Sequence, residues 1–105
     1  MGRMIVLANA AEGRDDEYNE WYNTVHIPEI LAGAAPFTAA QRFKMADAQM
    51  GEPEHGYLAI YEFEGPAADA IAALGAALKD GTRSDASAGG AILYFVDELG
   101  DRVTS

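Results

Sequence analysis

The chain has 105 residues, half of them hydrophobic by type, and its 17 acidic and 7 basic side chains give a formal net charge of -10. This length predicts one domain, residues 1–105. The acidic balance excludes nucleic-acid binding, because phosphate backbones are repelled and the basic residues form no stripe. No apolar run approaches the ~20 residues of a membrane helix, and no signal-peptide pattern is present, so we expect a cytoplasmic protein without a membrane partner. The lack of Cys excludes disulfides and thiolate metal ligands.

The first elements follow from short patterns. Residues 3–10 form an apolar run without helical spacing, which predicts a buried strand. The acidic residues that follow suit a helix N-terminus, with Asp15 as the expected cap. Four apolar side chains at i, i+3, i+4 and i+7 then predict a helix with one buried stripe: Tyr18, Trp21, Tyr22 and Val25.

Pro28 interrupts this helix. It has no backbone N–H, and it disfavours helical geometry at Ile27. The helix therefore either kinks there or stops before a short new turn that begins with Pro28. His26 lies at this break, and we expect Gly33 to end the element.

The middle and the end of the chain predict three strands and a second helix. Residues 37–45 and 57–64 alternate with a period of two, which predicts a hairpin in which Arg42 and Lys44 can face Glu62 or Glu64. An Ala-rich segment after Gly65-Pro66 predicts a helix that stops at residues 79–81, with Gly81 at the C′ position. A small, polar loop leads to a last strand at residues 91–96.

The order of strand, helix, strand, strand, helix, strand predicts an α+β, ferredoxin-like βαββαβ fold. Both helices then cover one face of a four-stranded antiparallel sheet. Bulky apolar residues nevertheless occupy both faces of the strands, as where Met4 and Val6 oppose Ile5 and Leu7. An exposed patch of that size is unusual for a monomer, so we expect a homodimer through the sheet face. The alternative is that strand propensity alone places these residues outside.

His26 is the main candidate for chemistry. Helical angles place it at the border of the apolar stripe, facing the edge of the core or a cleft between helix and sheet. Glu29 can orient or charge its imidazole if the helix continues through Pro28. The alternative is a structural His that hydrogen-bonds a carbonyl freed at the helix break.

The residues expected around His26 suit a small hydrophobic, aromatic or enol-like ligand, since they combine ring faces with hydrogen-bonding groups. They are Trp21, Tyr22, Tyr57, Tyr61 and Asn9. Their alternative role is ordinary core packing, which we favour for Tyr18 and Trp21, whereas Asn19 and Asn23 point towards solvent. His55 lies in a polar loop, and the two His residues show no metal-ligand spacing, so we expect no metal site.

Residues 20–31, Glu-Trp-Tyr-Asn-Thr-Val-His-Ile-Pro-Glu-Ile-Leu, resemble the first helix of EthD-like proteins of the dimeric α/β-barrel superfamily, and the strand Ala-Gln-Arg-Phe at residues 40–43 is similar to that group. The resemblance implies sheets packed back to back and, in each subunit, a pocket between helices and sheet. In enzymes of this group a His near the end of the first helix acts as acid or base. Only His26 matches; a second catalytic His and the Asn-Trp-His set of heme-degrading relatives have no counterparts.

The leading hypothesis is a proton-transfer isomerase, cyclase or lactone-converting enzyme acting on a small aromatic or polyketide-like substrate without a cofactor. His26 would move the proton, and Tyr22 or Tyr61 would orient the substrate oxygen. One alternative is a cofactor-independent monooxygenase of the same superfamily. The other is a non-catalytic protein that binds a small ligand.

Overall fold

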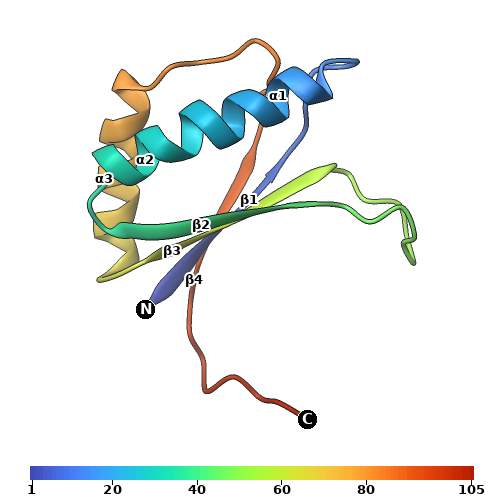
Figure 1. The fold of residues 1–105 in the computed structure, drawn as a ribbon. Coiled ribbons are helices and arrows are strands. Elements are labelled where there is room, and N and C mark those ends of the chain that lie inside the picture. The colour runs from blue at the N-terminus through green and yellow to red at the C-terminus, as the bar shows by residue number, and fades with distance from the viewer.

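The computed structural model describes residues 1–105 and has one four-stranded antiparallel sheet, in the order β2-β3-β1-β4. The elements in chain order are β1 (Gly2–Ala8), α1 (Asp15–Trp21), the π-helical turn η1 (Tyr22–His26), α2 (Ile27–Gly33), β2 (Phe37–Lys44), β3 (Tyr57–Phe63), α3 (Ala67–Asp80) and β4 (Ile92–Asp97). The helices lie together on one side of the sheet (Figure 1). The predicted α+β ferredoxin-like fold is therefore confirmed. No helix has the length and apolar character needed to cross a membrane.

The core lies between the sheet and the helices. Residues of β1 and β3 alternate strictly between buried and half-buried positions. The alternation was predicted for β3, whereas the apolar run of β1 predicted a strand buried throughout. The buried set includes Met4, Tyr61 and Phe63, each at most 1% exposed. Phe63 contacts the rings of Phe37 and Phe95 at about 6 Å between centroids, so apolar packing joins the edge strands to the middle of the sheet.

The first helix is continuous across Pro28, which corrects the predicted break. Ile27 keeps helical angles, φ -60° and ψ -50°, and its amide donates to the carbonyl of Tyr22, five residues earlier. This wider turn accommodates a proline that lacks an N–H and crowds the carbonyl four residues before it. The expected cap is also wrong, because Arg14 holds the N-cap position and Asp15 is the first helical residue.

Strand β2 contains a β-bulge that the alternation of its sequence did not indicate. The register shifts between Phe37 and Ala39. One extra residue in a strand turns every later side chain to the opposite face of the sheet. Phe37 and Arg42 therefore both lie on the helix side of the sheet. Phe43 faces outward, with 43% of its surface exposed. Arg42 pairs across the sheet with Ala59. The bulge therefore places a cation in the aromatic core.

Helix α3 ends at Asp80, close to the predicted stop, but not by the predicted cap. Gly81 has φ -74°, which is an ordinary extended conformation and not the left-handed one of a C′ glycine. The next residue, Thr82, donates its backbone N–H to the Glu29 carboxylate at 2.6 Å. This contact directs the chain out of α3 towards α2.

Candidate functional site

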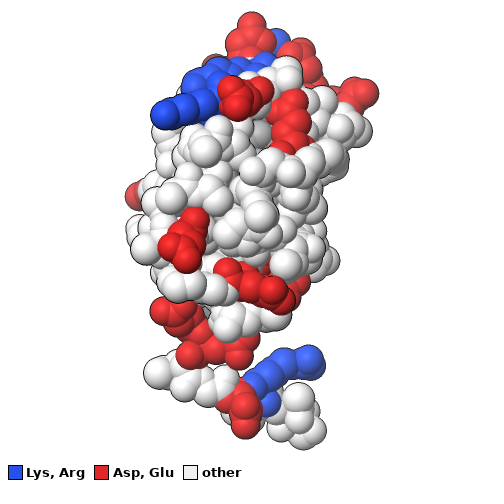
Figure 2. Space-filling view, turned by 90° about the vertical axis from the view of Figure 1, so that its left-hand side faces the viewer, with Lys and Arg blue, Asp and Glu red and all other residues white.

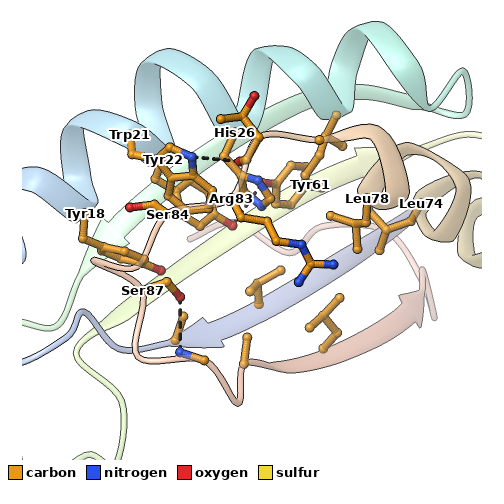
Figure 3. Close-up of a pocket in the computed structure, with 18 of the residues that line it drawn as sticks. Tyr18, Trp21, Tyr22, His26, Tyr61, Leu74, Leu78, Arg83, Ser84 and Ser87 are labelled. Atoms are coloured by element: carbon orange, nitrogen blue, oxygen red, sulfur yellow. Dashed lines mark hydrogen bonds between the residues drawn. The ribbon is translucent and has the colours of Figure 1, made fainter.

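A cavity of about 400 Å³ lies between the helices and the sheet and is partly covered by the loop of residues 81–91. Its floor is apolar, with Met4 and Val6 of β1 among the residues that line it. Its polar groups come from the first helix, from β3 and from the loop (Figure 3). This volume lies at the lower end of the range for small-ligand sites and suits a molecule of one or two rings.

His26 lines this cavity, in the position expected for a cleft between helix and sheet. Its ring stacks on Trp21 at 4.5 Å and meets the edge of Tyr22 at 4.7 Å. The π turn explains the stacking, because it brings residues five apart onto one side of the helix. No hydrogen bond ties the imidazole to a helix carbonyl, so the geometry does not match the structural alternative.

The imidazole of His26 is neutral near pH 7. Burial lowers the pKa of His26 below its ordinary value of 6.5, and this effect outweighs the opposing charge of Glu29. Glu29 does not orient the ring, which corrects that expectation, because its carboxylate accepts the Thr82 N–H instead. A neutral imidazole on a cavity wall can accept a proton from a ligand.

Tyr22 and Tyr61 form a pair of buried hydroxyl groups beside His26. The Tyr61 hydroxyl donates to the Tyr22 hydroxyl at 3.0 Å, and both residues line the cavity. Burial is the main reason why the pKa values of both phenols are raised, so both carry their protons at neutral pH. One hydrogen bond uses one of the two protons, which leaves the other available to a ligand oxygen.

A double-mutant cycle tests the pairing of these hydroxyl groups. We expect Tyr22→Phe and Tyr61→Phe each to lower the free energy of unfolding by about 1 kcal/mol, because each leaves the other hydroxyl without its partner. The double variant should lose less than the sum, with a coupling energy of about 1 kcal/mol measured by urea unfolding. Tyr18→Phe is the control, since the Tyr18 ring lines the same cavity but its hydroxyl makes no protein hydrogen bond. Additive losses would contradict the pairing.

Arg42 supports the hydroxyl pair from the side of the sheet, a role that the sequence analysis missed. Its guanidinium lies 4.3 Å from the centroid of the Tyr22 ring, and its Nη1 donates to the Asn23 side chain at 3.2 Å. It pairs with neither Glu62 nor Glu64, because the bulge in β2 turns it to the buried face. A cation over an aromatic face stabilises the ring's position. The sequence carried no signal for this role, because the alternation of the strand predicts the opposite face for Arg42.

Tyr57 and Asn19 form a network beside the cavity. The Tyr57 hydroxyl donates to Asp15 at 2.6 Å and accepts from Asn19 at 3.3 Å. Neither residue is part of the cavity lining. Asn19 is half-buried in this network, so the expectation that it points to solvent is wrong.

Asn9 is not brought to the cavity. Its side-chain amide donates to the Glu54 carbonyl at 3.1 Å and accepts from the Gly56 N–H at 2.8 Å. These contacts attach the long β2–β3 loop to the end of β1. Because both functional groups of the amide are used, the structure gives Asn9 a structural position in place of the expected binding position.

The loop of residues 81–91 is tethered to the first helix on both sides of Arg83. Before it, the Trp21 indole N–H donates to the Thr82 carbonyl at 3.0 Å, in addition to the Glu29 contact. After it, the Arg14 guanidinium donates to the backbone and to the side chain of Asp85, each at 3.1 Å. The loop therefore has a defined position as one wall of the cavity.

Glu29→Ala tests the first tether. We expect hydrogen exchange of the Thr82 amide to accelerate by about tenfold, because the charge-assisted bond to the carboxylate is lost. Glu29→Gln should have a smaller effect, since it keeps an acceptor oxygen. Glu20→Ala, on the exposed side of the same helix, is the control. Amide exchange followed by NMR measures all three, and equal rates in all variants would show that the carboxylate does not hold the loop.

Known family models and curated proteins give no match to this chain. Solved structures do. The heme-degrader MhuD of Mycobacterium tuberculosis, with two hemes bound in its active site, is 17% identical with a TM-score of 0.66, covering 98% of this chain and 100% of its own. An EthD family protein of Bacillus halodurans is 16% identical with a TM-score of 0.60, covering 94% and 99%.

A putative antibiotic biosynthesis monooxygenase of Nitrosomonas europaea has a similar structure. It is 13% identical with a TM-score of 0.56, covering 95% of this chain and 100% of its own. Sequence identities this low are evidence for a shared fold alone. The matched region includes almost every helix and strand of this chain. The chain therefore shares its ferredoxin-like fold with these proteins, which is the fold that the order of its elements predicted.

Proposed function

We propose that the protein is an enzyme that moves protons on a small aromatic or polyketide-like molecule, as an isomerase, cyclase or lactone-converting enzyme. One observation carries the proposal. The neutral imidazole of His26 lies on the wall of a largely apolar cavity, beside the hydroxyl groups of Tyr22 and Tyr61, of which one proton is not used in their mutual hydrogen bond. A base and a hydrogen-bond donor that face one cavity are the two groups that enolisation needs.

In this mechanism a ligand carbonyl oxygen accepts the hydrogen bond from the Tyr22 and Tyr61 pair. His26 removes a proton from the carbon next to that carbonyl and becomes an imidazolium. The electrons of the C–H bond form the enolate, which the phenol hydrogen bond stabilises. The imidazolium then returns the proton to a different atom of the ligand, which completes an isomerisation and restores neutral His26.

Two probes test the proposal. The enol of 4-hydroxyphenylpyruvate loses its ultraviolet absorbance on tautomerisation, and 2-tetralone exchanges its acidic C–H protons for deuterium in an NMR tube. We expect the protein to accelerate at least one reaction beyond free imidazole at equal concentration. If it accelerates neither, proton transfer at this site is not supported.

The monooxygenase alternative has support in the likeness to the putative antibiotic biosynthesis monooxygenase. A reduced aromatic ligand would itself supply electrons to oxygen within the cavity. Oxygen uptake with a hydroquinone distinguishes this reaction from tautomerisation, which consumes no oxygen. A non-catalytic binder would instead gain thermal stability from the probes and yield no product by mass spectrometry.

Heme, the ligand of MhuD, fits the described side chains poorly. Helix α3 contains no His, and His26 is the only imidazole in the lining. The rings of Trp21 and Tyr22 lie 4.5 and 4.7 Å from that imidazole, so two aromatic side chains crowd the one nitrogen ligand that the lining would offer to an iron. We therefore include no heme in the proposed reaction.

The proposal includes a homodimer formed through the sheet face that the helices leave uncovered. That face carries Ile5 and Ile60 at its centre, and Tyr94, which is 57% exposed. A hollow lined partly by Phe43 and Ile60 lies beside them. An apolar face of this kind suits a two-fold contact, in which each chain offers the same surface to the other. The cavity opens on the other side of the sheet and would be complete in each subunit.

A further inference from the structure

The cavity carries a charge opposite to that of the protein. Arg83 is the only permanently charged residue in the lining, and no Asp or Glu contributes to it. The whole chain has 17 acidic and 7 basic side chains. Figure 2 shows acidic groups spread around the face that it presents, with basic groups confined to a few places. The negative charge of the protein repels an anionic ligand, but the cavity attracts its anionic group through Arg83.

The guanidinium of Arg83 has no carboxylate partner within the protein. The ion pairs of the chain are made by Arg3 with Glu62 and Glu98, and by Arg14 with Glu17 and Asp85. In Figure 3 the Arg83 side chain extends from the loop across the cavity. A guanidinium offers five N–H donors in a fixed fork, and here no protein side chain uses them.

The tethers on both sides of Arg83 fix the backbone from which its exposed side chain extends. Thr82 is held by the first helix through both its N–H and its carbonyl. Asp85 is held through its carbonyl and its carboxylate by Arg14. Asp85, the nearest acidic residue along the chain, is thereby engaged with another cation. Fixing the backbone lowers the entropy lost when the Arg83 side chain binds a ligand.

We infer that Arg83 binds a carboxylate group of the ligand, so that the substrates are aromatic or cyclic carboxylic acids. The inference rests on the proposed function, because it places the reacting oxygen of the same molecule at Tyr22 and Tyr61. The fork of a guanidinium matches the two oxygens of a carboxylate. One guanidinium balances a single negative charge, whereas the second charge of a phosphate monoester would meet no further cation in the lining.

Calorimetric titration with two matched probe pairs tests the inference. The pairs are 4-hydroxybenzoate with 4-hydroxybenzamide, and 6-hydroxy-2-naphthoate with its primary amide. We expect the unmodified protein to bind at least one acid about five- to tenfold more tightly than its amide, as for a partly exposed charge-assisted pair. Arg83→Gln should remove this preference by lowering the affinity for the acid much more than the affinity for the amide, and Arg83→Lys should keep part of the preference.

Arg102→Gln is the matched control, since it makes the same charge change in the exposed C-terminal tail. Equal binding of acid and amide, an equal loss in Arg102→Gln, or no binding of any probe would each overturn the inference. Because binding is measured without turnover, a preference for acids that depends on Arg83 would stand even if the protein accelerated no proton transfer. Conversely, tautomerisation of neutral 2-tetralone would stand if that preference were absent.

Discussion

Replacing His26 by Gln is expected to lower kcat/KM for a turned-over probe by about 10²- to 10⁴-fold, the usual contribution of a positioned general base. Gln keeps a polar side chain of similar size but cannot accept a proton at neutral pH. The secondary structure, measured by circular dichroism, should be unchanged. His55→Gln is the control, because His55 lies in the β2–β3 loop and outside the cavity lining. Undiminished turnover in His26→Gln would show that another group moves the proton.

The pH profile gives this prediction a second readout. Burial holds the pKa of His26 below 6.5, so the imidazole is already the neutral base at pH 7. Activity should therefore be level from pH 7 to 8 and should fall as the pH drops through the lowered pKa. An inflection above 6.5 would contradict the buried setting of the ring.

The free energy of unfolding should also fall as the pH drops through this range. The unfolded chain takes up a proton at His26 more readily than the folded chain does, so the folded state loses stability as the pH falls from 6.5 towards the lowered pKa. His26→Gln removes this contribution. The difference in unfolding free energy between variant and unmodified protein should therefore change across that pH interval and stay constant above it.

The sequence was sufficient for the architecture because β1 is a short, continuous apolar run, β3 has a clear apolar period of 2, and the first helix has a clear period of 3.6. It was also sufficient to single out His26, which lies at a helix position fixed by local spacing. The orientation of its ring was not predictable. A π turn depends on how the helix relieves the crowding at Pro28, and two outcomes, a kink and a stop, looked equally compatible with the sequence.

Non-local contacts decided the rest of the site. A single-residue bulge in β2 turned Arg42 inward, and the alternation of its neighbours contains no sign of that shift. Arg83 lies in a stretch of small, polar residues that indicated only a connecting loop. Its place at the cavity depends on partners 53 and 61 residues away from Thr82, namely Glu29 and Trp21. Contacts over such separations have no local pattern.

Ile5→Asp is expected to split the proposed homodimer into monomers. Ile5 lies opposite Ile60 on one neighbouring strand and opposite Tyr94 on the other, at the centre of the uncovered sheet face. A carboxylate buried there between two sheets loses its hydration, and Arg3, the cation on the same face of β1, already pairs with Glu62 and Glu98. A two-fold axis would also bring a second carboxylate near the first. A cost of about 4 kcal/mol for burying an unpaired charge weakens association by about a thousandfold.

Sedimentation velocity at micromolar concentration measures this change. The unmodified chain should sediment at twice its mass of 11.2 kDa, and Ile5→Asp at 11.2 kDa. Ile71→Asp is the control, because it makes the same substitution on the exposed side of α3, where Ile71 is 51% exposed. An unmodified chain that sediments as a monomer would refute the dimer. Since the cavity lies on the helix side of the sheet, a folded Ile5→Asp monomer should still bind the acid probes, which would separate assembly from ligand binding.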